Sequence, residues 1–192
     1  MEITVHENFW DELILSQFQS KIDSFWKNEL KVGLQYNWWP DEVVLDSGPV
    51  LTHSWTEDDK SPSIEDIKNR IGKVCDVSKS DSLYCHLHFW LRGSYIPWHK
   101  DKDRNGHSGI ATTTFLDERI IDGWNWNWGG SHLYMDKDST VHGSHKRSEI
   151  RVEYPEYNKM IMHEGIYHAT TILSPSALMR ITLQTFKVCC PY

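Results

Sequence analysis

Residues 95–101 read Tyr95-Ile96-Pro97-Trp98-His99-Lys100-Asp101, and this stretch decides how the rest of the chain is interpreted. Side chains alternate between the two faces of a β-strand, so His99 and Asp101 would point to the same side. Farther along the chain, His168 would complete a set of two histidines and one carboxylate. Such a set binds one face of a metal ion and leaves other positions open, which favours non-haem Fe(II) and oxygen chemistry.

The segment around His168 also predicts how an arginine reaches the same place. His168 begins a β-prone stretch, the Ser-Pro-Ser sequence at 174–176 predicts a turn, and the next strand carries Arg180. In that strand Arg180 and Thr182 alternate with apolar residues, as the lining of a pocket would. An arginine in so apolar a strand needs an acidic partner, and a carboxylate that accepts two hydrogen bonds would supply it.

Length and composition indicate one globular domain. The chain has 192 residues, of which 39% are hydrophobic, and its net charge is −7. No stretch has the apolar length of a membrane span, and the first residues lack the basic region and apolar run of a signal peptide, so we expect a cytoplasmic protein. The acidic balance argues against a nucleic-acid partner, because phosphate binding needs a surplus of Lys and Arg.

Two helices are predicted in the first part of the chain, over residues 8–29 and 62–76. Apolar residues recur at roughly helical spacing in the first of them, which gives it one buried face: Phe9, Leu13, Phe18, Ile22 and Phe25. Asn8 is a plausible N-cap. From Ser82 onward, short β-prone segments separated by Gly, Pro, Asn and Asp replace the helical pattern. They cover residues 82–91, 110–115, 131–135, 158–162, 168–173 and 179–188.

This order of elements predicts an α+β domain that is mainly β, with helices packed on one face of antiparallel sheets. Six or more short strands fit a two-sheet jelly roll or a related barrel. We expect a single domain over residues 1–192, with a helical flank over about 1–80 and a β core over about 81–190.

Four segments in this order resemble the 2-oxoglutarate- and Fe(II)-dependent dioxygenases, in their prolyl 4-hydroxylase-like branch. The first is Gly93–Asp101, the second is Thr112–Asp117, and the third is the Trp-Gly-Gly turn within Trp124–Ser131. The fourth is His168 followed by Arg180. Together they span a little over half of the chain.

The resemblance implies a double-stranded β-helix core, a cupin-like jelly roll, flanked by N-terminal helices. It implies Fe(II) bound by His99, Asp101 and His168, 2-oxoglutarate bound by Arg180, O2 as the oxidant, and ascorbate as an accessory reductant. The expected reaction hydroxylates a peptidyl or free prolyl residue, or another amino-acid side chain of a peptide or protein. It converts 2-oxoglutarate to succinate and CO2.

Other residues are candidates for the same site. Further contacts to 2-oxoglutarate are expected from His88, Trp90, Thr114 and Thr182. Trp90 and Phe115 stand near positions where the branch commonly has tyrosine. Candidate substrate contacts are Tyr95, Trp124, Trp126 and Trp128. Histidines 142, 145 and 163 are predicted to lie in loops.

Several alternatives stay open from the sequence. The three tryptophans in 124–128 could form a stacking platform or could pack one face of a sheet. A platform would also suit a non-catalytic jelly-roll module that binds carbohydrate or peptide, and an oxygenase of nucleobases is a third, less favoured, possibility. Residues 139–148 could form a substrate lid or a plain exposed connection. Cys189-Cys190 could bind metal or respond to redox, or could be ordinary reduced thiols.

Overall fold

The computed structural model describes residues 3–27, 35–37, 48, 50–75, 77, 82–101, 109–135 and 150–188. The segment 139–148, His142, His145, Cys189 and Cys190 lie outside the described residues, so the alternatives attached to them stay as predictions.

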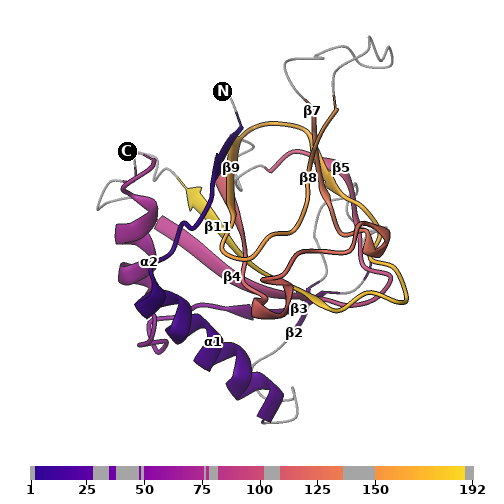
Figure 1. Cartoon of the computed structure of the whole chain (residues 1–192). Helices are drawn as coiled ribbons and strands as arrows, with labels where there is room; N and C mark the ends of the chain where they lie inside the picture. The colour runs from indigo at the N-terminus through magenta and orange to yellow at the C-terminus, as the bar shows by residue number, and fades with distance from the viewer. Residues whose placement is uncertain are drawn as a thin grey trace.

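Two antiparallel sheets make up the core of the molecule (Figure 1). The larger sheet has the strand order β1-β9-β6-β11-β4-β3-β2 and the smaller one β5-β10-β7-β8. The larger sheet contains β1 (Thr4–His6), β2 (Gln35–Asn37), β3 (Val50–Ser54), β4 (Ser82–Trp90), β6 (Ile110–Phe115), β9 (Met160–Glu164) and β11 (Arg180–Val188). The smaller one contains β5 (Ile96–His99), β7 (His132–Met135), β8 (Ile150–Glu153) and β10 (His168–Thr170). The sheets face each other as a jelly roll, which confirms the predicted fold class.

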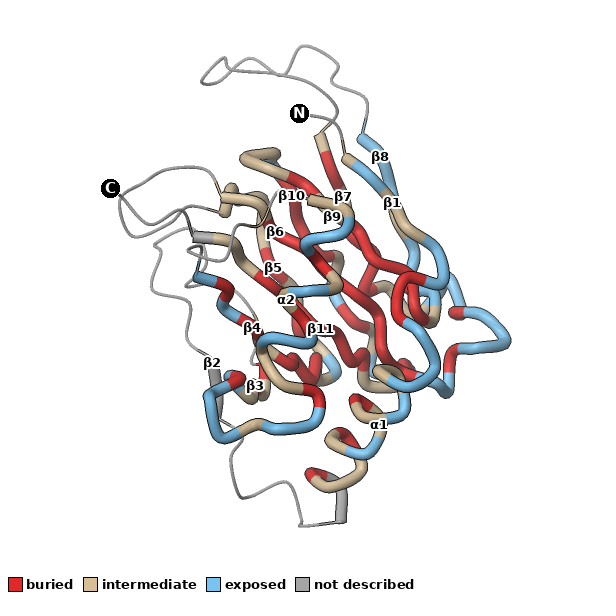
Figure 2. Tube along the Cα trace, turned by 90° about the vertical axis from the view of Figure 1, so that its left-hand side faces the viewer, coloured by how far each residue is buried: buried red, intermediate tan, exposed pale blue. Residues whose placement is uncertain are grey.

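Helices cover the outer face of the larger sheet. Helix α1 (Glu12–Lys27) buries Phe18, Ile22 and Phe25 in one apolar cluster with residues of β4 and β11, and α2 (Ile64–Ile71) adds Ile67 and Ile71 to it. Figure 2 shows the buried residues concentrated in the sheets and on the inward side of α1. Two short 3-10 turns, η2 (Glu118–Ile120) and η3 (Trp126–Trp128), lie between β6 and β7. None of the described helices has the length and apolarity of a membrane span.

The first helix begins later than predicted. Asp11 acts as its cap, because its Oδ1 accepts a hydrogen bond from the amide of Ile14 (3.0 Å), and Asn8 instead adopts a positive φ of 50°. Leu13, expected on the buried face, is 67% exposed. At about 100° per residue it lies roughly 180° around the helix from Ile22, so the two cannot share one face.

The first 80 residues also contribute strands to the sheet. Strand β1 pairs with β9, and β3 pairs with β4 along its full length, from Val50↔Trp90 to Ser54↔His86. Strands β1, β2 and β3 of the larger sheet therefore come from the part of the chain that was expected to form the helical flank.

The two faces of the larger sheet serve different purposes. Across β11 the register pairs Arg180 with Trp90, and Thr182 with both His88 and Phe115, so these side chains share the inner face toward the smaller sheet. The alternating residues face the helices. This alternation brings polar side chains into the space between the sheets.

Candidate metal centre

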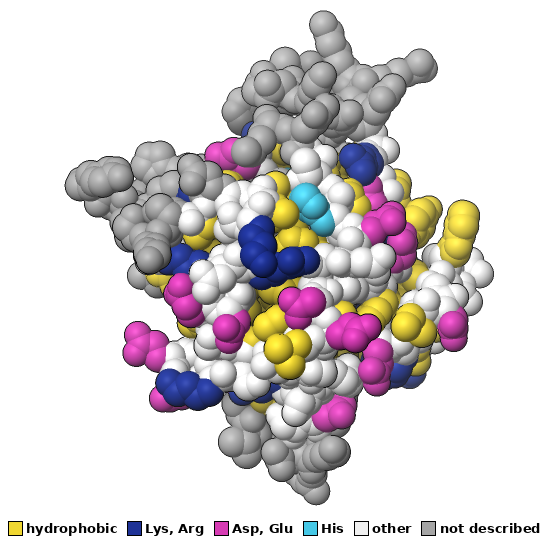
Figure 3. Space-filling view, turned by 60° about the vertical axis from the view of Figure 1, so that its left-hand side comes forward, with side chains coloured by type: hydrophobic (Ala, Val, Ile, Leu, Met, Phe, Trp, Pro, Cys, Tyr) yellow, Lys and Arg dark blue, Asp and Glu magenta, His cyan; other side chains and the backbone are white. Residues whose placement is uncertain are grey.

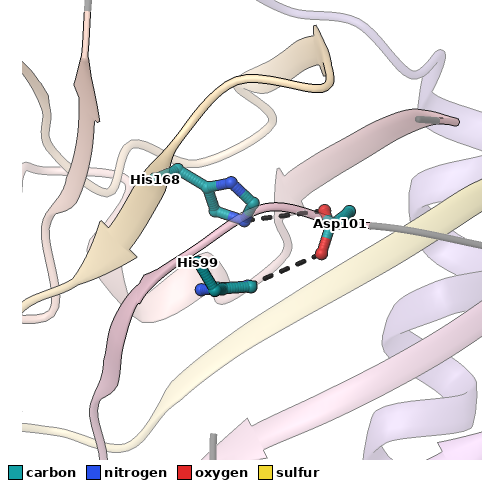
Figure 4. Close-up of side chains that lie close together, drawn as sticks. All are labelled: His99, Asp101 and His168. Atoms are coloured by element: carbon teal, nitrogen blue, oxygen red, sulfur yellow. Dashed lines mark ion pairs between the residues drawn. The ribbon is translucent and has the colours of Figure 1, made fainter. Parts of the chain in front are cut away.

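The structure brings His99, Asp101 and His168 together at one end of the smaller sheet. His99 ends β5, His168 begins β10, and the two are register partners, while Asp101 follows β5 (Figure 4). Nε2 of His99 lies 3.5 Å from Oδ1 of Asp101, and Nε2 of His168 lies 3.5 Å from Oδ2 of the same carboxylate. One potential ligand atom from each residue lies within 4.8 Å of the others, so a single metal ion could contact all three.

Backbone contacts fix which imidazole nitrogen faces the centre. Nδ1 of His99 lies 2.8 Å from the carbonyl oxygen of Pro97, and Nδ1 of His168 lies 3.0 Å from that of Ile166. A carbonyl oxygen can only accept a hydrogen bond, so Nδ1 carries the proton in both rings. Each Nε2 therefore directs its lone pair toward the centre, as a metal ligand requires.

The protonation states of the candidate ligands also suit metal binding. Burial lowers the pKa of His168, which keeps its imidazole neutral. Burial alone would raise the pKa of Asp101, but the imidazoles of His168, His99 and His163, in their protonated forms, outweigh this effect and lower that pKa to about 2. Imidazole nitrogens and an ionised carboxylate form the donor set that Fe(II) accepts, so these residues fit the ion that the resemblance implies.

His163 is a fourth residue at this centre, and its prediction as a loop residue is wrong. It lies in β9 and is 2% exposed, with Nε2 3.9 Å from Oδ2 of Asp101 and its ring centre 4.3 Å from that of His168. Burial lowers its pKa to about 3, and its Nδ1 has no hydrogen-bond partner among the described residues. Period-two alternation with Ile161 could have revealed this position.

Arg180 lies fully buried between the sheets. Its Nη1 donates a hydrogen bond to the carbonyl of Gly130, and its Cζ lies 4.2 Å from the ring centre of Trp90. Nε and Nη2 have no partner among the described residues, and burial lowers the pKa of the guanidinium to about 9. Leaving buried donors without acceptors costs free energy, so the interior around Arg180 would favour the binding of an anion. A carboxylate of 2-oxoglutarate fits that requirement.

The other predicted co-substrate contacts divide between the two faces. Trp90 and Thr182 lie inside, where the indole Nε1 donates to the Thr182 hydroxyl at 2.8 Å, and His88 contacts the Thr52 hydroxyl through Nδ1 at 2.9 Å. Thr114 faces the helices instead, and its hydroxyl accepts a 3.3 Å hydrogen bond from Nε1 of Trp10. The structure therefore does not place Thr114 at the site.

The predicted substrate contacts do not reach the centre. A small pocket beside it is lined by the triad, Ile96, Ala111, Thr113, His132, Thr170 and Gln184, among others, but by none of the three tryptophans. Trp124 is buried and packs edge-on against Trp128, whereas Trp126 is 76% exposed and contacts Tyr154 with the two rings tilted by 32°. The cluster is therefore neither one platform nor a packed sheet face. Tyr95 precedes β5 and does not line this pocket either.

No protein-family model and no curated protein sequence matches this chain. Several solved structures do match it. A prolyl-4-hydroxylase from Pseudomonas putida gives a TM-score of 0.66 at 10% identity, over 98% of this chain and 93% of the other. The chain has the fold of the prolyl hydroxylases.

Two further structures support this. A Trichoplax adhaerens prolyl hydroxylase, solved with a peptide fragment of hypoxia inducible factor, gives a TM-score of 0.67 at 10% identity, over 96% and 82% of the two chains. A 2OG-Fe(II) oxygenase-family oxidoreductase from Burkholderia pseudomallei gives 0.61 at 12% identity, over 96% and 84%. At these identities the likeness establishes the fold, and the site residues must carry the chemistry.

Proposed function

We propose that this protein is a 2-oxoglutarate- and Fe(II)-dependent dioxygenase that hydroxylates an amino-acid side chain. The observation that carries the proposal is the common location of two features between the sheets. A two-histidine, one-carboxylate triad stands at one end of the interior, and the same space holds a buried arginine, two of whose donor nitrogens have no partner in the described part of the chain.

Each residue has a defined part in this reaction. His99, Asp101 and His168 would hold Fe(II), which when bound supplies oxygen activation coupled to the decarboxylation of 2-oxoglutarate to succinate and CO2. With only these three protein ligands, the metal would keep open positions at which the co-substrate could bind. Arg180 binds the distal carboxylate and so orients the co-substrate, while Trp90 holds the guanidinium in place from one side.

A prolyl residue in a peptide or as the free amino acid is the substrate class we favour, with another amino-acid side chain as the next choice. One of the similar structures contains a bound peptide, which supports a peptide substrate. On the face shown in Figure 3, a small group of Lys and Arg side chains lies among more widely spread acidic ones, so the described residues there form no continuous basic surface, which disfavours nucleic acid. The cytoplasmic location stays a prediction.

The test measures succinate formation from 2-oxoglutarate with Fe(II), using proline-containing peptides and free proline, and detects oxygen insertion by mass spectrometry. His99→Ala and Arg180→Ala should each abolish or strongly reduce both products. Arg92→Ala is the matched control, because Arg92 is an exposed arginine whose Nε donates to the carbonyl of Ala177. Turnover that is unchanged in His99→Ala would refute the proposal.

A further inference from the structure

His132 lies between the metal centre and Arg180. Residues 130–134 run along the interior: the Gly130 carbonyl accepts from Arg180, and Tyr134 is the register partner of His168. His132, two residues from each, is 2% exposed and lines the same small pocket as the triad. Its imidazole therefore faces the space that a molecule bound to both the metal and Arg180 would cross.

The hydrogen bond to Tyr134 decides the tautomer of His132. Nδ1 of His132 lies 3.0 Å from the Tyr134 hydroxyl, and both side chains are buried. If Nδ1 donated, neither the phenolic hydrogen nor the lone pair of Nε2 would have a hydrogen-bond partner among the described residues. If the hydroxyl donates instead, only the Nε2–H of His132 is left over, because Nε2 has no partner among the described residues. The second arrangement leaves fewer unsatisfied groups, so Nε2 carries the proton.

Three buried donors that have no acceptor among the described residues then border the same aromatic ring: Nε2 of His132 and Nε and Nη2 of Arg180. The His132 ring centre lies 5.7 Å from that of Phe115, and Cζ of Arg180 lies 5.8 Å from it. Phe115 itself offers no hydrogen-bonding atom. The His132 imidazole is neutral, because its burial and, to a smaller extent, the positive charge of Arg180 hold its pKa well below the usual value.

We propose that Nε2–H of His132 is a second donor, beside Arg180, to the distal carboxylate of the 2-oxo acid that the site binds. This inference rests on the proposed function and extends it. Arg180 alone would favour any anion at that position, whereas an added neutral donor selects a dicarboxylate over a shorter monocarboxylate. His132 is in this view a specificity-determining residue.

Calorimetry with Mn(II) in place of Fe(II) tests the inference through the affinity for 2-oxoglutarate. His132→Asn keeps a polar atom for Tyr134 but removes the donor that faces the space between the metal centre and Arg180. The affinity for 2-oxoglutarate should therefore fall by about tenfold or more. His132→Gln places an amide donor close to the position of Nε2 and should keep most of the affinity. The affinity for Mn(II) should be the same in all three proteins.

Two comparisons separate the possible outcomes. For 2-oxobutyrate, which lacks the distal carboxylate, His132→Asn and wild type should bind equally; an equal loss for both acids would overturn the inference, as would unchanged binding of 2-oxoglutarate. Failure of wild type to bind 2-oxoglutarate would refute the proposed function instead. If the variants do not fold, the Nε2 nitrogen NMR signal of wild-type His132, recorded with Zn(II), must shift on addition of 2-oxoglutarate; an unmoved signal overturns the inference.

Discussion

Asp101 depends on its neighbours more than the other two residues of the triad. It lies just beyond β5, and three imidazoles surround its carboxylate, whereas His99 and His168 are each held by a backbone carbonyl. His163 contributes from the opposite sheet, where burial keeps its ring fixed. A residue that orients a metal ligand typically accounts for about 10- to 100-fold in metal affinity.

We therefore expect His163→Ala to weaken Mn(II) binding by about tenfold or more, because the Asp101 carboxylate loses a neighbour that restricts its position. Titration calorimetry of the protein without 2-oxoglutarate measures this directly. His86→Ala is the control, since His86 contacts the Ser54 hydroxyl (3.0 Å) and none of its described contacts reaches the triad. Equal Mn(II) affinity in the His163 variant and the control would contradict the expectation.

Single residues show which parts of the site the sequence can reveal. His99 and Asp101 are close in the chain, and the order of His168 and Arg180 around a turn is local, so they could be predicted. Thr114 could not, because a run of three threonines hides the phase of β6, and a shift of one residue exchanges the two faces of a strand. His163 was missed because β9 continues to Glu164, two residues past the predicted strand end.

Strand β3 shows the same limit at the scale of an element. The polar character of Thr52 does not by itself indicate a buried position, yet Thr52 is buried and its hydroxyl lies 2.9 Å from Nδ1 of His88 on the neighbouring strand. Only tertiary context supplies such a partner. The helices, by contrast, show their apolar spacing directly, and both were predicted with errors at their ends.

Asp59 joins α1 to the segment after β3. Its Oδ1 accepts hydrogen bonds from Lys21 and from His53 (3.1 Å), and its Oδ2 accepts one from the Thr56 amide (2.8 Å). Burial raises the pKa of Asp59, but these bonds and the nearby charges outweigh it, so the pKa lies below the ordinary 3.8. A lowered folded-state pKa contributes stability above the unfolded value, and this stability is lost as the pH falls through the folded one.

Asp59→Asn should therefore reduce the free energy of unfolding at pH 7 by about 1–3 kcal/mol, since charge-assisted hydrogen bonds are lost. The difference from wild type should shrink as the pH falls below about 4. Urea unfolding at both pH values measures it, with Asp58→Asn as the control because Asp58 is an exposed neighbour. A destabilisation of equal size at both pH values would rule out this account.

The turn before β7 holds Arg180 in position, and Gly129 makes it possible. Gly129 has a φ of 67°, and a Cβ there would lie 2.0 Å from the carbonyl oxygen of Ile172. Gly129→Ala should destabilise the protein by more than about 1 kcal/mol and displace the Gly130 carbonyl that binds Arg180. Gly123→Ala is the matched control: its φ is also positive, at 111°, but no atom of the described residues lies within 4 Å of the added Cβ.

Thermal unfolding and calorimetry separate these effects. Gly129→Ala should lose 2-oxoglutarate affinity while keeping Mn(II) affinity, because the triad lies at the other end of the interior. Gly123→Ala should show the smaller loss of stability and normal binding of both. If Gly129→Ala binds 2-oxoglutarate as wild type does, the turn does not determine the position of Arg180.

The whole molecule is built around the larger sheet. One apolar cluster joins α1 and α2 to its outer face, and a second fills the space between the sheets. Strands from both ends of the chain meet in this sheet, where β1 pairs with β9 and β11 lies between β4 and β6. Because strands from both ends of the chain pair within one sheet, we infer that residues 1–192 fold as one domain. The sequence agrees with this inference, since it contains no proline-rich or charged stretch that reads as a linker.

Ligands should stabilise this domain in two separable steps, because the triad belongs to the smaller sheet and Arg180 to the larger one. Mn(II) alone should raise the melting temperature of wild type by ordering β5 against β10, and 2-oxoglutarate should add a second rise by linking the two sheets. Each ligand, when present at 100 times its Kd, raises the free energy of unfolding by about 2.7 kcal/mol. Differential scanning fluorimetry measures both steps, and a chelator should reverse both.

Variants assign each step to its end of the interior. His168→Ala should lose both shifts, because the co-substrate needs the metal as its first anchor. Arg180→Ala should keep the Mn(II) shift and lose the 2-oxoglutarate increment, whereas Arg92→Ala should keep both. If 2-oxoglutarate stabilises wild type equally with and without Mn(II), it binds elsewhere, since an acid held between the triad and Arg180 gains most of its affinity from contacting both.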